Sequence, residues 1–130
     1  KAFARYFDNN DPYSGKTRTG GIMTDCRENG INMPKSYFDL IRKWASNRGL
    51  YKDGDPKTQA LKLVEEVGET CKAILKSDQA EIEDGIGDCV VVLTNLAHLC
   101  NTDIEHCIEL AYNEIKDRKG KMDNGTFKKD

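Results

Sequence analysis

Acidic side chains are concentrated in two short segments that could together bind a cation. Residues 65–69 contain three glutamates, and residues 81–88 contain Glu81, Asp84 and Asp88. In a helix, which turns by about 100° per residue, the acids of each segment share one face. Up to six carboxylates would therefore converge if two such helices paired. A cluster of this kind repels itself unless a cation is bound.

The type of ligand indicates which cation this would be. Hard carboxylate oxygens favour Mg²⁺, with Mn²⁺ as the other candidate, over Zn²⁺. Magnesium shares its shell with substrate phosphates, which suits a nucleotide substrate better than a structural role. The spacing alone also fits a solvated helix face without metal. Gly68, Gly85 and Gly87 weaken that alternative, because each costs about 1 kcal/mol relative to alanine inside a helix and so indicates a need for space.

The elements that must position these acids are helices. Apolar residues at three- and four-residue steps predict helices over residues 34–48, 56–76, 79–100 and 102–119. Gly49 is expected to end the first helix, and Asp55 to cap the start of the second. Thr102 and Glu105 form a capping-box pattern at the start of the fourth. Residues 50–54 are expected to form a loop, and strand patterns are nearly absent apart from weak ones at the end of the chain.

The second and third helices are expected to pair as an antiparallel hairpin. Each carries an apolar stripe, formed by Ala60, Val64, Val67, Cys71 and Ile74 on the second helix and by Ile82, Ile86, Cys89, Leu93, Leu96 and Cys100 on the third. These stripes should meet, with the acids along the edge of their seam. We therefore predict an all-α, four-helix-bundle-like domain over residues 34–130. Residues 1–33, rich in turn-forming residues, should form an irregular arm.

Composition restricts the class of protein. The 130 residues fit one domain, and no apolar run approaches the roughly 20 residues that a membrane span needs. A net charge of −2 and a pI near 5.7 give no basic surplus for binding nucleic acid. Four of the five cysteines fall at apolar helix positions. We therefore expect buried free thiols, a reducing compartment and a cytoplasmic location, and we see no cleavable leader that would favour secretion.

The acidic segments belong to longer motifs that resemble a known family. Residues 59–69, Gln-Ala-Leu-Lys-Leu-Val-Glu-Glu-Val-Gly-Glu, and residues 84–88, Asp-Gly-Ile-Gly-Asp, look like the MazG-like nucleoside triphosphate pyrophosphohydrolases of the all-α NTP pyrophosphatase superfamily. The likeness covers residues 36–129. It implies Mg²⁺-dependent hydrolysis of (deoxy)nucleoside triphosphates to monophosphate and pyrophosphate, by attack of an activated water on the α-phosphorus. It also implies a fold completed by oligomerisation, as a homodimer or homotetramer.

The resemblance assigns roles to individual acids. The family signature is Glu-Glu-x-x-Glu followed by Glu-x-x-Asp. By this likeness Glu66, Glu69 and Asp88 bind magnesium. Glu65 is a further ligand or orients the attacking water.

One position departs from the signature, since Gly85 stands where the family has the glutamate of Glu-x-x-Asp. Asp84 or Glu81 could supply the missing oxygen from the same helix face, and Asp84 is included among the expected ligands. Alternatively, the enzyme works with a depleted metal shell. In the third alternative catalysis is lost, and the chain is a silent helical nucleotide-binding or interaction module.

The resemblance also places substrate-binding residues at the end of the fourth helix. Asn113, Lys116 and Arg118 are expected near the phosphates or the nucleotide, although a solvated helix end rich in basic residues fits the sequence equally well. Lys62, within the first motif, is a further candidate. Trp44 could stack on a base, but a lone Trp at an apolar helical position is also typical of a core.

Overall fold

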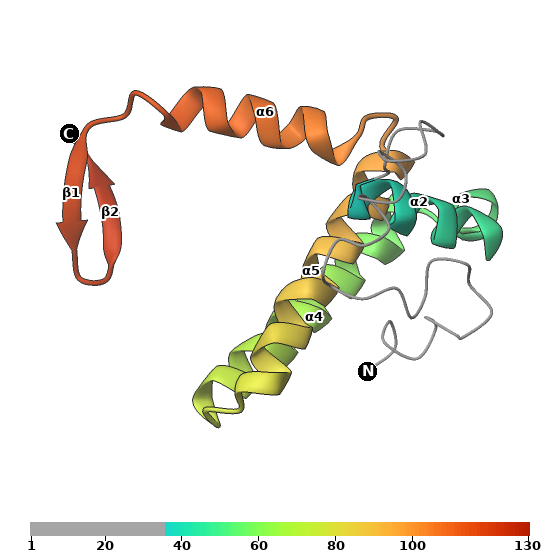
Figure 1. Ribbon diagram of the computed structural model, residues 1–130, viewed down its shortest axis with the longest axis horizontal. Coiled ribbons are helices and arrows are strands. Elements are labelled where there is room, and N and C mark those ends of the chain that lie inside the picture. The colour runs from blue at the N-terminus through green and yellow to red at the C-terminus, as the bar shows by residue number, and fades with distance from the viewer. Residues whose placement is uncertain (1–35) are drawn as a thin grey trace, which may run out of the picture.

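A computed structural model describes residues 36–130. Its elements are, in chain order, α2 (Tyr37–Asn47), α3 (Leu50–Asp53), α4 (Pro56–Leu75), α5 (Gln79–Leu99), α6 (Ile104–Ile115), β1 (Gly120–Asp123) and β2 (Thr126–Lys129) (Figure 1). This confirms the predicted all-α class, since the only sheet among the described residues is this small two-stranded one. The arm predicted over residues 1–33 lies outside the described residues.

Side-chain caps fix where the helices begin. Asp55 accepts a hydrogen bond from the Thr58 backbone N–H at the start of α4, as predicted. The start of α6 was predicted wrongly, because Asp103 and not Thr102 is its N-cap. The predicted loop at residues 50–54 contains the single turn of α3. Gly49, with a positive φ of 78°, redirects the chain between α2 and α3.

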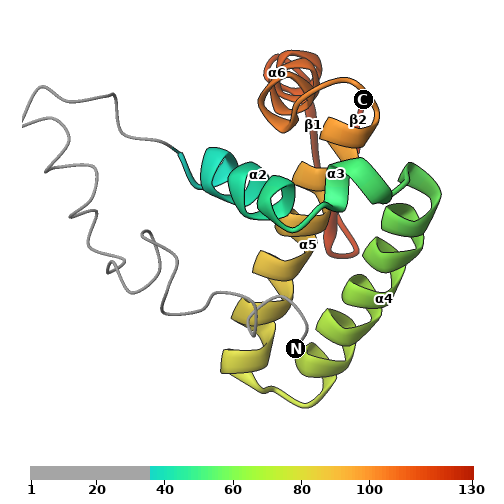
Figure 2. The same ribbon diagram turned by 90° about the vertical axis from the view of Figure 1, so that its right-hand side faces the viewer.

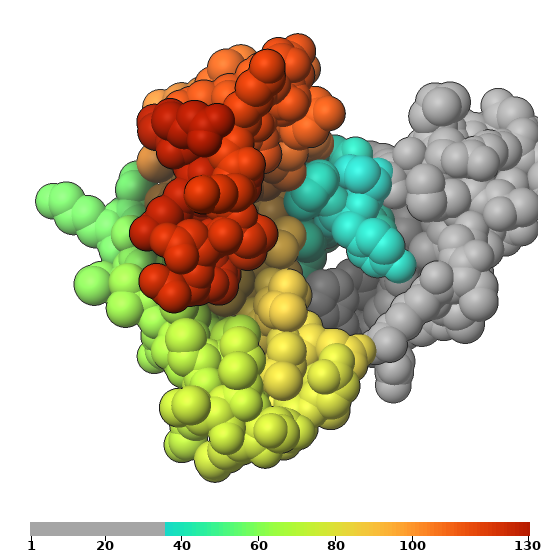
Figure 3. Space-filling view, turned by 90° about the vertical axis from the view of Figure 1, so that its left-hand side faces the viewer, coloured from blue at the N-terminus to red at the C-terminus, as the bar shows by residue number. Residues whose placement is uncertain are grey.

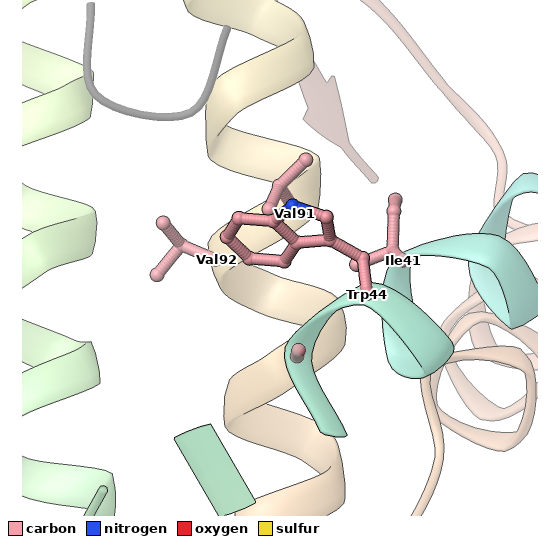
Figure 4. Close-up of a cluster of buried hydrophobic side chains, with 5 residues drawn as sticks. Ile41, Trp44, Val91 and Val92 are labelled. Atoms are coloured by element: carbon pink, nitrogen blue, oxygen red, sulfur yellow. The ribbon is translucent and has the colours of Figure 1, made fainter. Parts of the chain in front are cut away.

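The hydrophobic core joins α2 to α5. Ile41, Trp44 and Ala45 of α2 pack against Val91 and Val92 of α5, with the Trp44 ring lying along α5 (Figure 4). The α3 helix is held to the same end of α5 by the Tyr51 hydroxyl, which donates to Oδ1 of the buried Asn95 side chain at 2.7 Å, and by stacking of the Tyr51 ring on His98. This core fixes the orientation of α5, which carries one half of the acidic residues.

The α4–α5 hairpin forms as predicted, but other faces of the two helices are turned inward. Helices α4 and α5 run side by side in both views (Figures 1 and 2). The stripe predicted to face α5 is exposed at Val64, Val67 and Ile74, and on α5 Ile86 and Leu93 are exposed as well. The prediction that the two stripes meet is therefore wrong for the single chain. Periodicity identifies an apolar face but does not say which partner covers it.

Polar and small residues fill the seam between α4 and α5 instead. The buried members are Glu66 and Ala73 on α4 and Gly85, Asp88, Val92 and Asn95 on α5.

The exposed outer stripes explain a second correction. Cys71 and Cys100 are exposed, so the expectation of buried thiols fails for them, although the cysteines at 71, 89, 100 and 107 are all free.

The α6 helix and the β-hairpin project from the body. Figure 1 shows α6 leaving the end of α5 and the hairpin hanging from its far end, away from α4 and α5. The hairpin residues lie at the surface in the space-filling view (Figure 3). Arg42 of α2 anchors the base of α6 through two bonds to Glu105, of 2.8 and 2.7 Å. Among residues 36–130, none of the helices combines the length and the apolar composition that a membrane span requires.

Candidate metal and substrate site

Glu66 is the most deeply buried acid in the α4–α5 seam. Its relative exposure is 1%. Its Oε1 lies 3.5 Å from Lys62 Nζ, whereas Oε2 is buried and has no hydrogen-bond partner among the described residues. Burial raises the pKa of Glu66, and the neighbouring Glu69 carboxylate raises it further through its charge and a hydrogen bond. A buried carboxylate with an unused oxygen beside a second carboxylate is a favourable place for a cation.

Lys62 supplies positive charge to this cluster from one helical turn earlier. Its ammonium group pairs with Glu65 and, more distantly, with Glu66. A hydrogen bond to Glu65 raises the pKa of Lys62, against the opposing effect of partial burial. Lys62 was predicted to bind substrate, which stays a prediction. The structure places its ammonium group in contact with two of the expected catalytic acids.

Asp88 approaches the same region from α5. Its relative exposure is 5%, and its Oδ2 atom is buried. Thr70 of α4 meets Gly85 of α5, so Glu66, one turn before Thr70, and Asp88, one turn after Gly85, lie at the same level of the antiparallel seam. The seam thus contains one acid from each motif. Asp84 is half-buried in the preceding turn.

The close packing of α4 against α5 leaves no room for a side chain at position 85. A Cβ atom at this position would overlap Thr70 Oγ1 and would lie 3.1 Å from Thr70 Cβ and 3.2 Å from its Cα. The Thr70 hydroxyl in turn donates to the Glu66 carbonyl oxygen at 2.8 Å. The glycine that departs from the family signature therefore lies where the two helices come into close contact.

The described residues contain no group of three or more His, Cys, Asp or Glu side chains arranged to hold a metal ion. The predicted convergence of up to six carboxylates is thus not present in residues 36–130. The donor chemistry still fits magnesium, because this ion is usually bound by one or two carboxylates together with waters and substrate phosphates. The unused Glu66 oxygen is the structural observation that supports this fit.

A cavity of about 330 Å³ adjoins the acids near the turn between α4 and α5. It is lined by Glu69, Lys72, Ala73, Lys76, Asp78 and Glu81. Two lysines that the sequence analysis did not single out therefore lie beside an expected metal ligand. Their spacing from Glu69, three and seven residues along one helix, is a sequence signal that could have identified them.

The other predicted substrate residues are not brought to the acids by the single chain. Asn113, Lys116 and Arg118 are exposed on or just beyond α6, and Arg118 pairs with Glu114 at 3.4 Å. Trp44 is 6% exposed, lies in the core and has the Arg48 guanidinium 4.8 Å from its ring centroid. Its position matches the core interpretation and not stacking on a base.

Comparison with known proteins agrees with this arrangement. The family described as the MazG nucleotide pyrophosphohydrolase domain matches residues 55–123, from the cap of α4 to the end of β1 and over more than half of the chain. A curated relative is an uncharacterized 18.2 kDa protein in the rep-hol intergenic region of Haemophilus phage HP1 (strain HP1c1). It is 46% identical over 57 residues, which are 44% of this chain and 35% of the relative.

The chain therefore spans only about a third of that relative's length in the matched region. No solved structure matches. The family match includes both acidic segments and the cavity between them, together with the C-terminal part of the fold. From the paired acidic motifs, the helical hairpin and this match, we conclude that the chain belongs to the MazG nucleotide pyrophosphohydrolase family.

Proposed function

We propose that the protein hydrolyses (deoxy)nucleoside triphosphates to nucleoside monophosphates and pyrophosphate with the help of Mg²⁺. One observation carries the proposal. Glu66 is buried against Glu69 with one oxygen that has no hydrogen-bond partner among the described residues, at the level of Asp88 on the facing helix. Burying a carboxylate with an unpaired oxygen costs free energy, and a functional need for the charge would explain why it is retained.

The roles of the residues follow from their positions. Glu66, Glu69 and Asp88 would hold the metal, with Asp84, which precedes Gly85, in place of the missing family glutamate. Bound magnesium supplies positive charge that stabilises the phosphate oxygens.

Glu65 is exposed and pairs with Lys62. Its carboxylate would accept the proton of the attacking water. The water oxygen bonds to the α-phosphorus while the bond from that phosphorus to the bridging oxygen breaks. Pyrophosphate then leaves with the bridging oxygen.

The reaction assignment is tested by product analysis. The full chain is incubated with each ribo- and deoxyribonucleoside triphosphate and Mg²⁺, and the products are identified by ³¹P NMR. The proposal predicts monophosphate and pyrophosphate in equal amounts. Release of inorganic phosphate with a diphosphate would place the cleavage at another bond and refute it.

The residue assignment is tested with two matched variants. Glu66→Gln keeps the size of the side chain but removes its charge, and we expect turnover to fall by about 100-fold or more, as for loss of a metal-binding group. Glu83→Gln makes the same change of charge on α5 at an exposed residue that accepts a bond from Gln79. Equal activity of the two variants would contradict the proposed site.

Gly85 replaces a glutamate of the family signature, and substitution of the neighbouring Asp84 tests whether that residue compensates for the loss. If Asp84 supplies the missing oxygen, Asp84→Asn should weaken Mn²⁺ binding and lower turnover. Gly85→Glu is a poor test, because Thr70 occupies the space that the new side chain needs. Binding of triphosphate by the wild type without any turnover would support the silent nucleotide-binding alternative.

We also propose that the active form is a homodimer or a dimer of dimers in the cytoplasm. The outer stripe of α4, formed by Leu61, Val64, Gly68, Cys71 and Leu75, is exposed along its whole length. Ile86, Val90 and Leu93 on α5 are also exposed, as are Ile108, Tyr112 and Ile115 on α6. Apolar side chains at this density are typical of an interface. A second copy could also bring Asn113 and Lys116 of its α6 to the acids.

A further inference from the structure

The cavity beside Glu69 lies where the seam between α4 and α5 is left unfilled. Ala73, which is 5% exposed, is the one apolar residue of the lining. The last two turns of α4 contribute Lys72 and Lys76, and the start of α5 contributes Asp78 and Glu81. The cavity is thus open enough for a small ligand and lined almost entirely by charged side chains.

The cavity is continuous with the proposed catalytic acids through one shared residue. Glu69 lines the cavity and also interacts with the buried Glu66 carboxylate. Lys72 and Lys76, three and seven residues after Glu69, continue along the same side of α4. A ligand whose one end lies at Glu66 and Glu69 would therefore extend towards the two ammonium groups.

The charges of the lining select the kind of ligand. Three carboxylates and two lysines give the empty cavity a formal charge of −1, which does not attract a free anion. A divalent cation held by the carboxylates reverses this sign, and the lysines then add to the positive field. A diphosphate group that carries its own magnesium satisfies both sets of side chains, since its oxygens bind the metal and the ammonium groups together.

We propose that Lys72 and Lys76 bind the β- and γ-phosphates of the substrate, and pyrophosphate after cleavage. This inference rests on the proposed function and identifies a subsite for the leaving group. The α-phosphate would lie beside Glu66, Glu69 and Asp88, and the rest of the triphosphate would occupy the cavity. The nucleoside would then lie on the other side of the acids, away from the α4–α5 turn.

The test measures binding of pyrophosphate directly, so it does not depend on turnover. Wild-type protein is titrated calorimetrically with pyrophosphate in the presence of Mg²⁺. The double variant Lys72→Gln/Lys76→Gln is compared with Lys52→Gln/Lys57→Gln, which removes the same charge from exposed residues outside the cavity. Because charge-assisted bonds to phosphate are lost, we expect the cavity variant to bind at least about tenfold more weakly and the control to bind like the wild type.

A charge-preserving variant, Lys72→Arg/Lys76→Arg, should bind pyrophosphate nearly as well as the wild type. Circular dichroism verifies that each variant is folded. The subsite is supported if the wild type and the arginine variant bind pyrophosphate and the glutamine variant does not. This outcome holds whether or not any triphosphate is hydrolysed. Equal affinity of the cavity variant and the control, or no binding by the wild type, overturns it even if the wild type hydrolyses triphosphates.

Discussion

Glu66 combines burial, a like-charged neighbour and an oxygen without a described hydrogen-bond partner. Each of these features disfavours the ionised carboxylate, and a folded protein retains such a combination where function requires it. Lys62 offsets part of the cost, because its ammonium group lies close to both Glu65 and Glu66. Lys62 thus supplies, on one side of the acids, positive charge of the kind that a bound cation would supply.

Lys62 should therefore compete with the metal. Replacing it by glutamine removes a positive charge from the acids, so the affinity for Mn²⁺ should rise by about two- to fivefold, the range that a partly exposed ion pair provides. Calorimetric titration of Mn²⁺ measures this change. Lys57→Gln, on the same helix but outside the acidic cluster, is the control. Unchanged or weaker binding by Lys62→Gln would mean that the lysine does not oppose the cation.

Gly85 determines how closely α5 approaches α4. Gly85→Ala should lower the free energy of unfolding by about 1–3 kcal/mol, because the added methyl group overlaps the Thr70 side chain. In a Thr70→Ala background the hydroxyl and methyl groups of Thr70 are gone, so the same substitution should cost less. Urea unfolding of the four proteins gives the coupling free energy. Additive effects would show that the two residues do not compete for space.

At the scale of the helices, the sequence predicts which segments form helices better than it predicts which face of each helix turns inward. The start of α4 was identified because its cap is a local signal, namely Asp55 before a proline. Asp78 caps α5 in the same way, although it was not singled out in the sequence. Which face of α4 turns inward depends on what lies opposite it. The apolar stripe through Val64 and Val67 was expected in the seam, and the structure places Glu66 there. No local pattern shows whether an apolar face packs within its own chain or against another subunit.

The end of the chain illustrates the same limit. Helix α6 was expected to reach residue 119, but it ends at Ile115 and a β-hairpin follows. Asn124 and Gly125, with φ of 50° and 80°, form the tight turn, and Asn-Gly is the typical sequence of such a turn. That signal was present in the sequence. The acids of the candidate site were proposed because carboxylate chemistry and the family motif agree. Lys72 and Lys76 lie outside that motif, so their helical spacing from Glu69 gained significance only once the cavity was seen.

The link between α2 and α6 should depend on pH. A hydrogen bond from Arg42 holds the pKa of Asp39 below its usual 3.8 and the pKa of Glu105 below its usual 4.5. Because folding lowers these values, the stabilisation is complete above about pH 4.5 and is lost as the pH falls through the lowered pKa values. Both carboxylates are 46% exposed, so solvent weakens the effect.

Arg42→Met should therefore cost about 1 kcal/mol or less of unfolding free energy at pH 7, and this difference from the wild type should shrink at pH 3. Urea unfolding at the two pH values measures it, with Lys52→Met, at an exposed residue of α3, as a control that should show no such change. A difference that stays constant between pH 7 and pH 3 would assign the effect of Arg42 to packing of its stem and not to its ion pairs.

At the scale of the whole molecule, the arrangement of the described residues fits the proposed association between copies. Its polar seam faces inward, its apolar stripes face outward, and α6 with the hairpin projects from the body (Figure 1). Gly68 lies within the outer stripe of α4, and a Cβ there would have nothing within 4 Å in the described residues. A glycine in such a place costs helix stability without benefit to the single chain. Close approach by a second copy would explain it.

The proposed dimer makes a clear prediction for Val64, which is 69% exposed at the centre of that stripe. Val64→Lys should leave the single chain folded, since the new side chain reaches solvent, but it would bury a charge in the interface. Sedimentation velocity should give the wild type a mass at least twice the 14.6 kDa of one chain, and the variant a mass near 14.6 kDa.

Tyr37→Lys, which introduces the same charge at an exposed residue of α2, should sediment like the wild type. If the acids of one copy also need the α6 arm of another, triphosphate hydrolysis by Val64→Lys should decline as the protein dissociates on dilution, while the Tyr37 variant keeps its activity. A wild type that sediments as a single chain would refute the dimer, and the outer stripe would then need another partner.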